Sequence, residues 1–290
     1  MKIKLPLFSV GLSVLFSTVV FSQNATRAEW IAMDNSITAE LRKNGAKYET
    51  KRAIFWVERD GLTRAELEDF GKLVDRGMRD IAKYTGLKFD KKHFQAEKLE
   101  FFINSKPGIS RGSVEGKPFI YLPLIRVKEK RAPYLHEAMH KLAYKSNQAF
   151  WMVEGFSTYI QTHLGTRSGG YNANIFNPKN ADIHQLAGGH LKTDMGKKLL
   201  PLIGLNGAAL RSNPEDFAKY RPVFEDRVVA APAFYNMAES FVTFLVNKMG
   251  VKKVIRVFDS ADMEANIFKL TGRKMIDWKA DWMKSLNSPA

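Results

Sequence analysis

Apolar and polar positions alternate with a helical period between residues 63 and 86. Thr63 and Glu66 have the spacing of a capping box, and Gly86 ends the pattern. Between these ends, apolar residues recur at spacings of three and four: Leu67, Phe70, Val74, Met78 and Ile81. The pattern predicts one long helix with a single buried face.

Two apolar runs after this helix have the length and composition of strands. They cover residues 99–104 and 118–125. The segment between them, residues 106–117, contains three glycines and predicts a loop. A small sheet is therefore expected in this part of the chain.

Helical periodicity dominates the second half. Pro133 suits the first turn of a helix that should run to about Lys145. Further helices are expected at residues 152–164, 199–210, 234–249, 251–258 and 276–286. Residues 165–232 are rich in glycine, asparagine and proline, which indicates loops with short helices. The fold class predicted is α+β, a small sheet followed by a mostly helical part.

The amino terminus has the pattern of a signal peptide. Lys2 and Lys4 precede the uncharged apolar run of residues 5–21, and Val20-Phe21-Ser22 suits a signal peptidase. We expect residues 1–22 to be removed after Ser22, an uncleaved anchor being the alternative. The mature chain, without a transmembrane segment, would then be periplasmic or secreted.

The pattern divides the rest of the chain into an extension and one domain. Residues 23–60 are expected to form an N-terminal extension. Residues 61–290 form the expected domain, with its sheet at about 61–126 and its helices at about 127–290.

Composition limits the chemistry of the chain. It has no cysteine, so disulfides are excluded and metal ligands must come from His, Asp or Glu. The formal charge is +15, or +13 when Lys2 and Lys4 leave with the signal peptide. Such a charge favours contact with anionic surfaces or polymers, although a basic but otherwise ordinary protein is the alternative. No nucleic-acid-binding motif accompanies it.

Residues 136–140 read H-E-x-x-H. On a helix, His136 and His140 lie one turn apart on the same face, so both can reach one metal ion. Glu137 stands beside the first histidine, where it can act on a water at the metal without being a ligand.

A catalytic zinc usually has three protein ligands, and the best third candidate is Glu154. It lies near the start of the next predicted helix. The alternative is a solvated carboxylate stabilised by the helix dipole. His184 and His190, six residues apart in the loop-rich region, are alternative ligands or cleft residues.

The chain resembles the gluzincin metallopeptidases of the peptidase MA clan. The resemblance rests on H-E-x-x-H followed by W-x-x-E-G-x-[SA]-x-Y at residues 151–159. Within the clan it is to small bacterial peptidase-MA-like proteins and, more distantly, to the aminopeptidase N family. Segments 235–250 and 271–282 resemble later helices of the same group.

This resemblance implies a zincin-like domain with one zinc ion held by His136, His140 and Glu154. It also implies Glu137 as general base, and Tyr235 as a phenol that stabilises the tetrahedral intermediate. If Tyr235 only packs in the core, then Tyr159, Tyr171 or a histidine of residues 165–232 would be the donor.

The chain departs from the family pattern in three places. The spacer between His140 and Glu154 is shorter than in aminopeptidase N. The G-x-M-E-N segment that binds a free amine is not visible in residues 106–124. Thr158 stands where thermolysin-like enzymes have an aspartate.

Peptide-bond hydrolysis of a peptide or protein is the function expected. The rival from another class is an exported basic binding protein, catalytically silent, that docks on anionic polymers and has a metal site. A hydrolase with a non-peptide or very narrow substrate is a third possibility. Turnover by zinc-loaded protein separates an enzyme from the binding protein, and a substrate screen identifies the third case.

Overall fold

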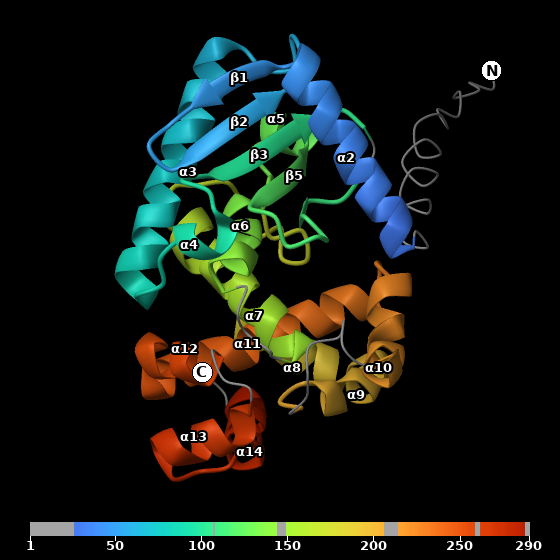
Figure 1. Cartoon of the computed structure of the whole chain (residues 1–290). Coiled ribbons are helices and arrows are strands. Elements are labelled where there is room, and N and C mark those ends of the chain that lie inside the picture. Colours follow the sequence, from blue (N-terminus) through green and yellow to red (C-terminus); the bar gives the residue numbers. More distant parts are fainter. Residues whose placement is uncertain (1–25, 107, 144–148, 206–213, 259–261, 288–290) are drawn as a thin grey trace, which may run out of the picture.

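The computed structural model describes residues 26–106, 108–143, 149–205, 214–258 and 262–287. The fold is α+β, as predicted: a five-stranded sheet and a mostly helical remainder, which lies below the sheet in Figure 1. The predicted signal peptide, residues 1–22, lies outside the described residues.

The sheet has the strand order β1-β2-β3-β5-β4. Its three central strands, β2 (Ala53–Val57), β3 (Leu99–Asn104) and β5 (Phe119–Pro123), are parallel. The edge strands β1 (Ala46–Glu49) and β4 (Arg111–Gly112) are antiparallel to their neighbours. The prediction for residues 99–104 is confirmed. β4 lies inside the segment expected to be a loop, and β5 ends before residue 125 because α5 (Leu124–Lys128) begins there.

Residues 26–60, within the segment expected as an N-terminal extension, contain one helix and two strands of the sheet layer. α2 (Arg27–Asn44) starts at a capping box made by Thr26 and Glu29, and β1 and β2 follow it. Within α2 only Asp34, Ile37 and Leu41 are buried, so the apolar pattern is too sparse for the sequence to reveal the helix.

Two ion pairs and one small apolar cluster hold α2 on the sheet. Asp34 pairs with Arg111 of β4, and Arg42 binds Glu100 of β3 at 2.9 Å. The Arg111 guanidinium also lies against the Trp30 ring, 4.4 Å from its centroid. Ile37 and Leu41 pack with two aromatic residues of the sheet, Phe102 and Tyr121.

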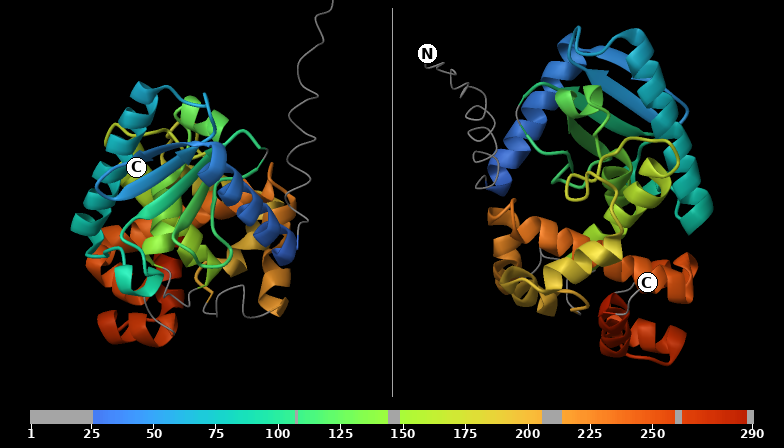
Figure 2. Two further views of the ribbon diagram at one scale, coloured as in Figure 1. Left: turned by 45° about the horizontal axis from the view of Figure 1, so that its top comes forward. Right: turned by 180° about the vertical axis from the view of Figure 1, so that it is seen from behind.

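The opposite face of the sheet carries the main core. α3 (Arg64–Thr85) confirms the long helix: its capping box is formed, and Gly86 ends it with a positive φ of 83°. The Phe70 ring of α3 lies 5.6 Å from Phe55 and 6.4 Å from Phe101. The two views of Figure 2 show α2 and α3 on opposite faces of the sheet.

The helical part begins with α6 (Tyr134–Leu142) and α7 (Phe150–Ile160). α6 ends three residues before Lys145, which lies outside the described residues. α7 starts two residues earlier than expected and continues as a π-helix, η1 (Gln161–Thr166). α11 (Ala230–Met249) also begins earlier than the predicted residue 234, and α12 (Val251–Phe258) is as predicted.

Short helices fill the region that the sequence leaves weakly patterned. In residues 165–232 these are α8 (Ile183–Leu191), α9 (Asp194–Leu199) and α10 (Pro214–Glu225). The other described helices are α4 (Lys91–Phe94), α13 (Met263–Thr271) and α14 (Met275–Asn287). The helix expected at residues 199–210 is wrong over residues 200–205, where only the 3₁₀ turn η2 (Leu200–Leu202) follows α9. Pro201 has no N–H to continue the hydrogen bonds of α9.

None of the described helices is by itself long and apolar enough to cross a membrane. The bent pair of residues 218–225 and 230–249, at 112° to each other, passes that test on length and composition alone.

Candidate metal centre

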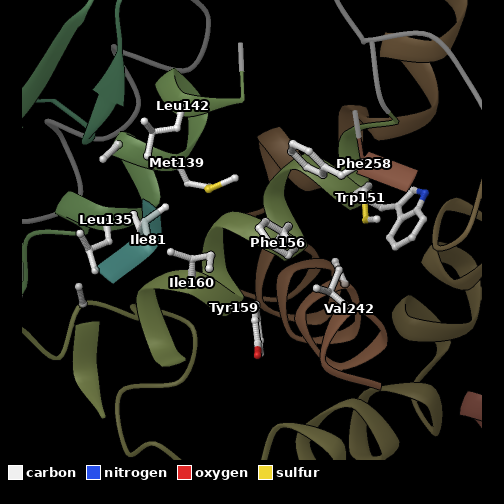
Figure 3. Packing of buried hydrophobic residues seen from close by; sticks show 14 of the residues in the cluster. Ile81, Leu135, Met139, Leu142, Trp151, Phe156, Tyr159, Ile160, Val242 and Phe258 are labelled. Atoms are coloured by element: carbon white, nitrogen blue, oxygen red, sulfur yellow. The ribbon is translucent and has the colours of Figure 1, made fainter. Parts of the chain in front are cut away.

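The motif helix α6 is held by packing on one face and by a side-chain cap at its start. Leu135, Met139 and Leu142 project from α6 into the core, as Figure 3 shows. Gln161, the first residue of the π-helix, accepts hydrogen bonds through Oε1 from the backbone N–H groups of Leu135 and His136, at 2.9 and 3.3 Å. The cap satisfies two N–H groups that have no partner inside the helix.

The structure brings the three predicted ligands together. The Nε2 atoms of His136 and His140 are 3.0 Å apart. Glu154 approaches both, with Oε2 3.2 Å from His136 Nε2 and Oε1 3.7 Å from His140 Nε2. These side chains retain 13–21% of their surface, so the group is reachable from solvent.

These spacings fit a tetrahedral metal ion. Zinc lies about 2.0–2.1 Å from nitrogen and oxygen ligands, which places two ligands of a tetrahedron about 3.3 Å apart. The three observed separations, 3.0, 3.2 and 3.7 Å, surround that value. Within the described residues, the same trio is the group of His, Asp and Glu side chains that could hold a metal ion.

Two hydroxyl groups on α7 orient the histidine rings. Thr158 Oγ1 lies 3.4 Å from His136 Nδ1, and Ser157 Oγ lies 3.4 Å from His140 Nδ1. The Thr158 hydroxyl already donates its proton to the Glu154 carbonyl oxygen at 2.8 Å, so it can only accept from His136 Nδ1–H. With its proton held on Nδ1, His136 can give up the proton on Nε2 and bind a metal ion there. The Thr158 hydroxyl thus orients the ring, as a carboxylate does in many zinc sites.

Electrostatics differentiates the two glutamates of the centre. Burial raises the pKa of Glu137 to about 7, and the positive charges of His136, Lys141 and Arg126 only partly oppose this effect. Burial also acts on Glu154, but there the charge of His140 and the hydrogen bond from His136 prevail and lower its pKa to about 2. Glu154 is therefore suited to bind a cation, and Glu137 to exchange a proton near neutral pH.

Tyr235 reaches the same centre from the second turn of α11. Its hydroxyl makes a hydrogen bond with the Glu154 carboxylate. Burial, together with the charge of Glu154, raises the pKa of Tyr235 well above its usual value, so the phenol keeps its proton and can donate it.

Glu154 is positioned by a close crossing of α7 and α11. A Cβ added at Gly155 would lie 2.7 Å from the Ala238 carbonyl oxygen of α11, where no side chain fits. Gly155→Ala is therefore expected to destabilise the fold by roughly 1–3 kcal/mol, because the two helices must separate. Chemical denaturation measures the loss. Gly189→Ala is the control, since nothing lies within 4 Å of the Cβ it adds, and equal stability of both variants would contradict the close crossing.

The residues considered as alternative metal ligands or hydrogen-bond donors contact other parts of the fold. His184 Nδ1 lies 2.9 Å from Ser240 Oγ, and His190 Nε2 lies 3.1 Å from Asn236 Nδ2, both in contacts between α8 and α11. The Tyr159 hydroxyl bonds to that of Tyr84 at 2.6 Å. The Tyr171 ring stacks on Phe70 in the core.

Sequence reasoning missed three residues beside the centre: Gln161, Glu239 and Arg126. Glu239 of α11 is buried, binds Asn174 Nδ2 at 3.0 Å and interacts electrostatically with His136. Arg126 of α5 interacts in the same way with Glu137. All three lie outside the two motifs, and only the position of Glu239 in the segment that resembles the later family helices offered a signal.

The chain matches no protein-family model, and a comparison with curated proteins finds no significant similarity. The family resemblance therefore rests on the motifs themselves.

Proposed function

We propose that this chain is a zinc-dependent peptidase with a zincin-like catalytic domain, related to the gluzincins. One observation carries the proposal: the convergence of His136, His140 and Glu154 on one point, beside a buried glutamate that is not part of the trio. A structural zinc site normally has four protein ligands. Three ligands leave a position for water, as hydrolysis requires.

In this proposal each side chain has one task. Zinc, when bound, supplies a Lewis acid and lowers the pKa of water toward ~7. Glu137 accepts a proton from the attacking water and transfers it to the leaving amine, a task matched by its raised pKa. Tyr235 donates its hydroxyl proton in a hydrogen bond to the oxygen on which negative charge develops.

The test is a cleavage assay on a peptide library, combined with metal analysis of the same preparation. One zinc per chain is expected, with cleavage that stops on chelation and returns with added zinc. Zinc bound at full occupancy with no cleavage of any peptide would favour the binding-protein alternative or a non-peptide substrate.

Replacing Glu154 with alanine is expected to weaken zinc retention strongly, because two histidines then hold the ion without the carboxylate. Zinc content after dialysis against a weak chelator measures the effect. Glu225→Ala is the control, since that exposed carboxylate pairs with Arg221 away from the trio. If Glu154→Ala keeps zinc like the wild type, the ligand assignment is wrong.

The proposal also includes export of the mature chain and contact with anionic cell-surface polymers. It draws support from the apolar run of residues 5–21 and from the net charge of +15.

A further inference from the structure

Two arginines come close to the candidate metal centre from different parts of the chain. Arg126 lies on α5, directly after the central strand β5, and its Nη1 atom donates to the Ser110 hydroxyl at 3.2 Å. Arg227 lies in the turn between α10 and α11. That turn is fixed by Asp226, whose Oδ1 accepts the backbone N–H groups of Val228 and Val229 at 3.0 and 2.8 Å.

Each guanidinium interacts with a residue of the centre. The charge of Arg126 acts on Glu137, and the charge of Arg227 acts on Tyr235. The Arg227 guanidinium also lies against the Phe176 ring, 5.4 Å from its centroid, and that ring lies 4.7 Å from the Tyr235 ring. Arg126 therefore lies near Glu137, and Arg227 lies near Tyr235, the two residues that a substrate would meet.

Neither charge is compensated by an ion pair. Within the described part of the chain, no carboxylate lies within 4.0 Å of the Arg126 or Arg227 guanidinium, whereas the neighbouring Arg131 pairs with Glu129 and Arg221 pairs with Glu225. Arg126 and Arg227 are close enough to repel each other, and Arg126 is partly buried. The negative charge that acts on Arg126 is that of Glu137, which forms no ion pair with it. A carboxylate placed between the two arginines would turn their repulsion into attraction.

We propose that Arg126 and Arg227 form a subsite that binds a carboxylate of the substrate beside the bond to be cleaved. The inference rests on the proposed peptidase function and adds a substrate class: peptides with an acidic side chain, or a free carboxyl terminus, close to the scissile bond. A guanidinium suits this role because its fork of donors matches the two carboxylate oxygens.

The choice of peptides distinguishes an acidic side chain from a free carboxyl terminus as the source of the carboxylate. A peptide that is cleaved by the wild type is made with Asp or Asn at each position near the cleaved bond, and each version with a free or amidated carboxyl terminus. We expect one of the two changes to alter kcat/KM by about 10- to 100-fold, the range of a charge-assisted hydrogen bond.

Arg126→Gln and Arg227→Gln are expected to abolish that preference by lowering kcat/KM for the acidic peptide, mainly through KM. The ratio of kcat/KM between the acidic and the neutral peptide should fall to about one, whereas a purely structural role would slow both peptides alike and leave that ratio unchanged. Arg126→Lys should restore part of the preference. Arg221→Gln is the control, because it removes the same charge from an exposed ion pair.

Binding gives a second readout that does not depend on turnover. Fluorescence anisotropy with labelled acidic and neutral peptides on chelator-treated protein should show tighter binding of the acidic peptide, and the difference should vanish in Arg227→Gln. Equal binding and equal cleavage of both peptides, with cleavage still dependent on Glu137, would overturn the subsite alone. If the wild type cleaves no peptide but still binds the acidic one through these arginines, the peptidase proposal fails and the anion site remains.

Discussion

Replacing Glu137 with glutamine is expected to lower kcat by at least ~10²–10⁴-fold and to leave zinc content and fold unchanged. General acid–base catalysis is typically worth that much, and a neutral amide cannot accept the proton of the attacking water. Glutamine has nearly the same shape and carries no charge. It therefore removes the cost of burying a carboxylate, the effect that raises the pKa of Glu137 to about 7. The folded state should therefore be as stable as the wild type, or more so.

The measurement is kcat on a cleaved peptide, with zinc content and thermal unfolding recorded on the same samples. Glu68→Gln is the matched control, because that glutamate on α3 is partly exposed and pairs with Arg64. If turnover in Glu137→Gln equals that of the control, Glu137 is not the base. If zinc is lost together with activity, the glutamate holds the site together instead of moving a proton.

Helices and strands with strong local signals could be predicted from the sequence. α3 has both caps and a continuous apolar stripe, and β3 is an apolar run that is almost wholly buried. α2 could not be found in this way, because it contacts the sheet through a few apolar residues and through ion pairs such as that of Asp34 with Arg111. Contacts of this kind join residues far apart in sequence and leave no periodic pattern.

The same distinction applies to the site. One helix fixes the relation of His136 to His140, so the spacing alone predicts that both reach one ion. The place of Glu154 depends on how α6 and α7 cross, so the sequence offered it only as the best candidate for a third ligand, near the start of the next helix. The contacts of the Ser157 and Thr158 hydroxyls with the histidines, the Gln161 cap and the position of Arg227 depend on tertiary packing, which the sequence does not show. For Thr158 the sequence showed only that it stands where thermolysin-like enzymes have an aspartate.

Tyr235→Phe is expected to lower kcat by ~10²–10³-fold with KM and zinc content little changed, if the phenol stabilises the developing oxyanion. Two features of the structure make Tyr235→Phe a suitable variant. The hydroxyl is already at the centre, bonded to Glu154, and its raised pKa keeps it protonated. The ring packs against Phe176 and Phe234, at 4.7 and 5.7 Å between centroids, so phenylalanine retains the packing.

Tyr159→Phe is the matched control for this variant. It removes a hydroxyl of the same kind from α7, but that hydroxyl bonds to Tyr84. The control should lose about 1 kcal/mol of stability at most and keep its kcat. If both variants turn over like the wild type, Tyr235 is a packing residue that orders Glu154. A loss of kcat confined to Tyr235→Phe, at full zinc content, separates a donor to the transition state from a residue that only holds a ligand, because the latter would fail first in metal binding.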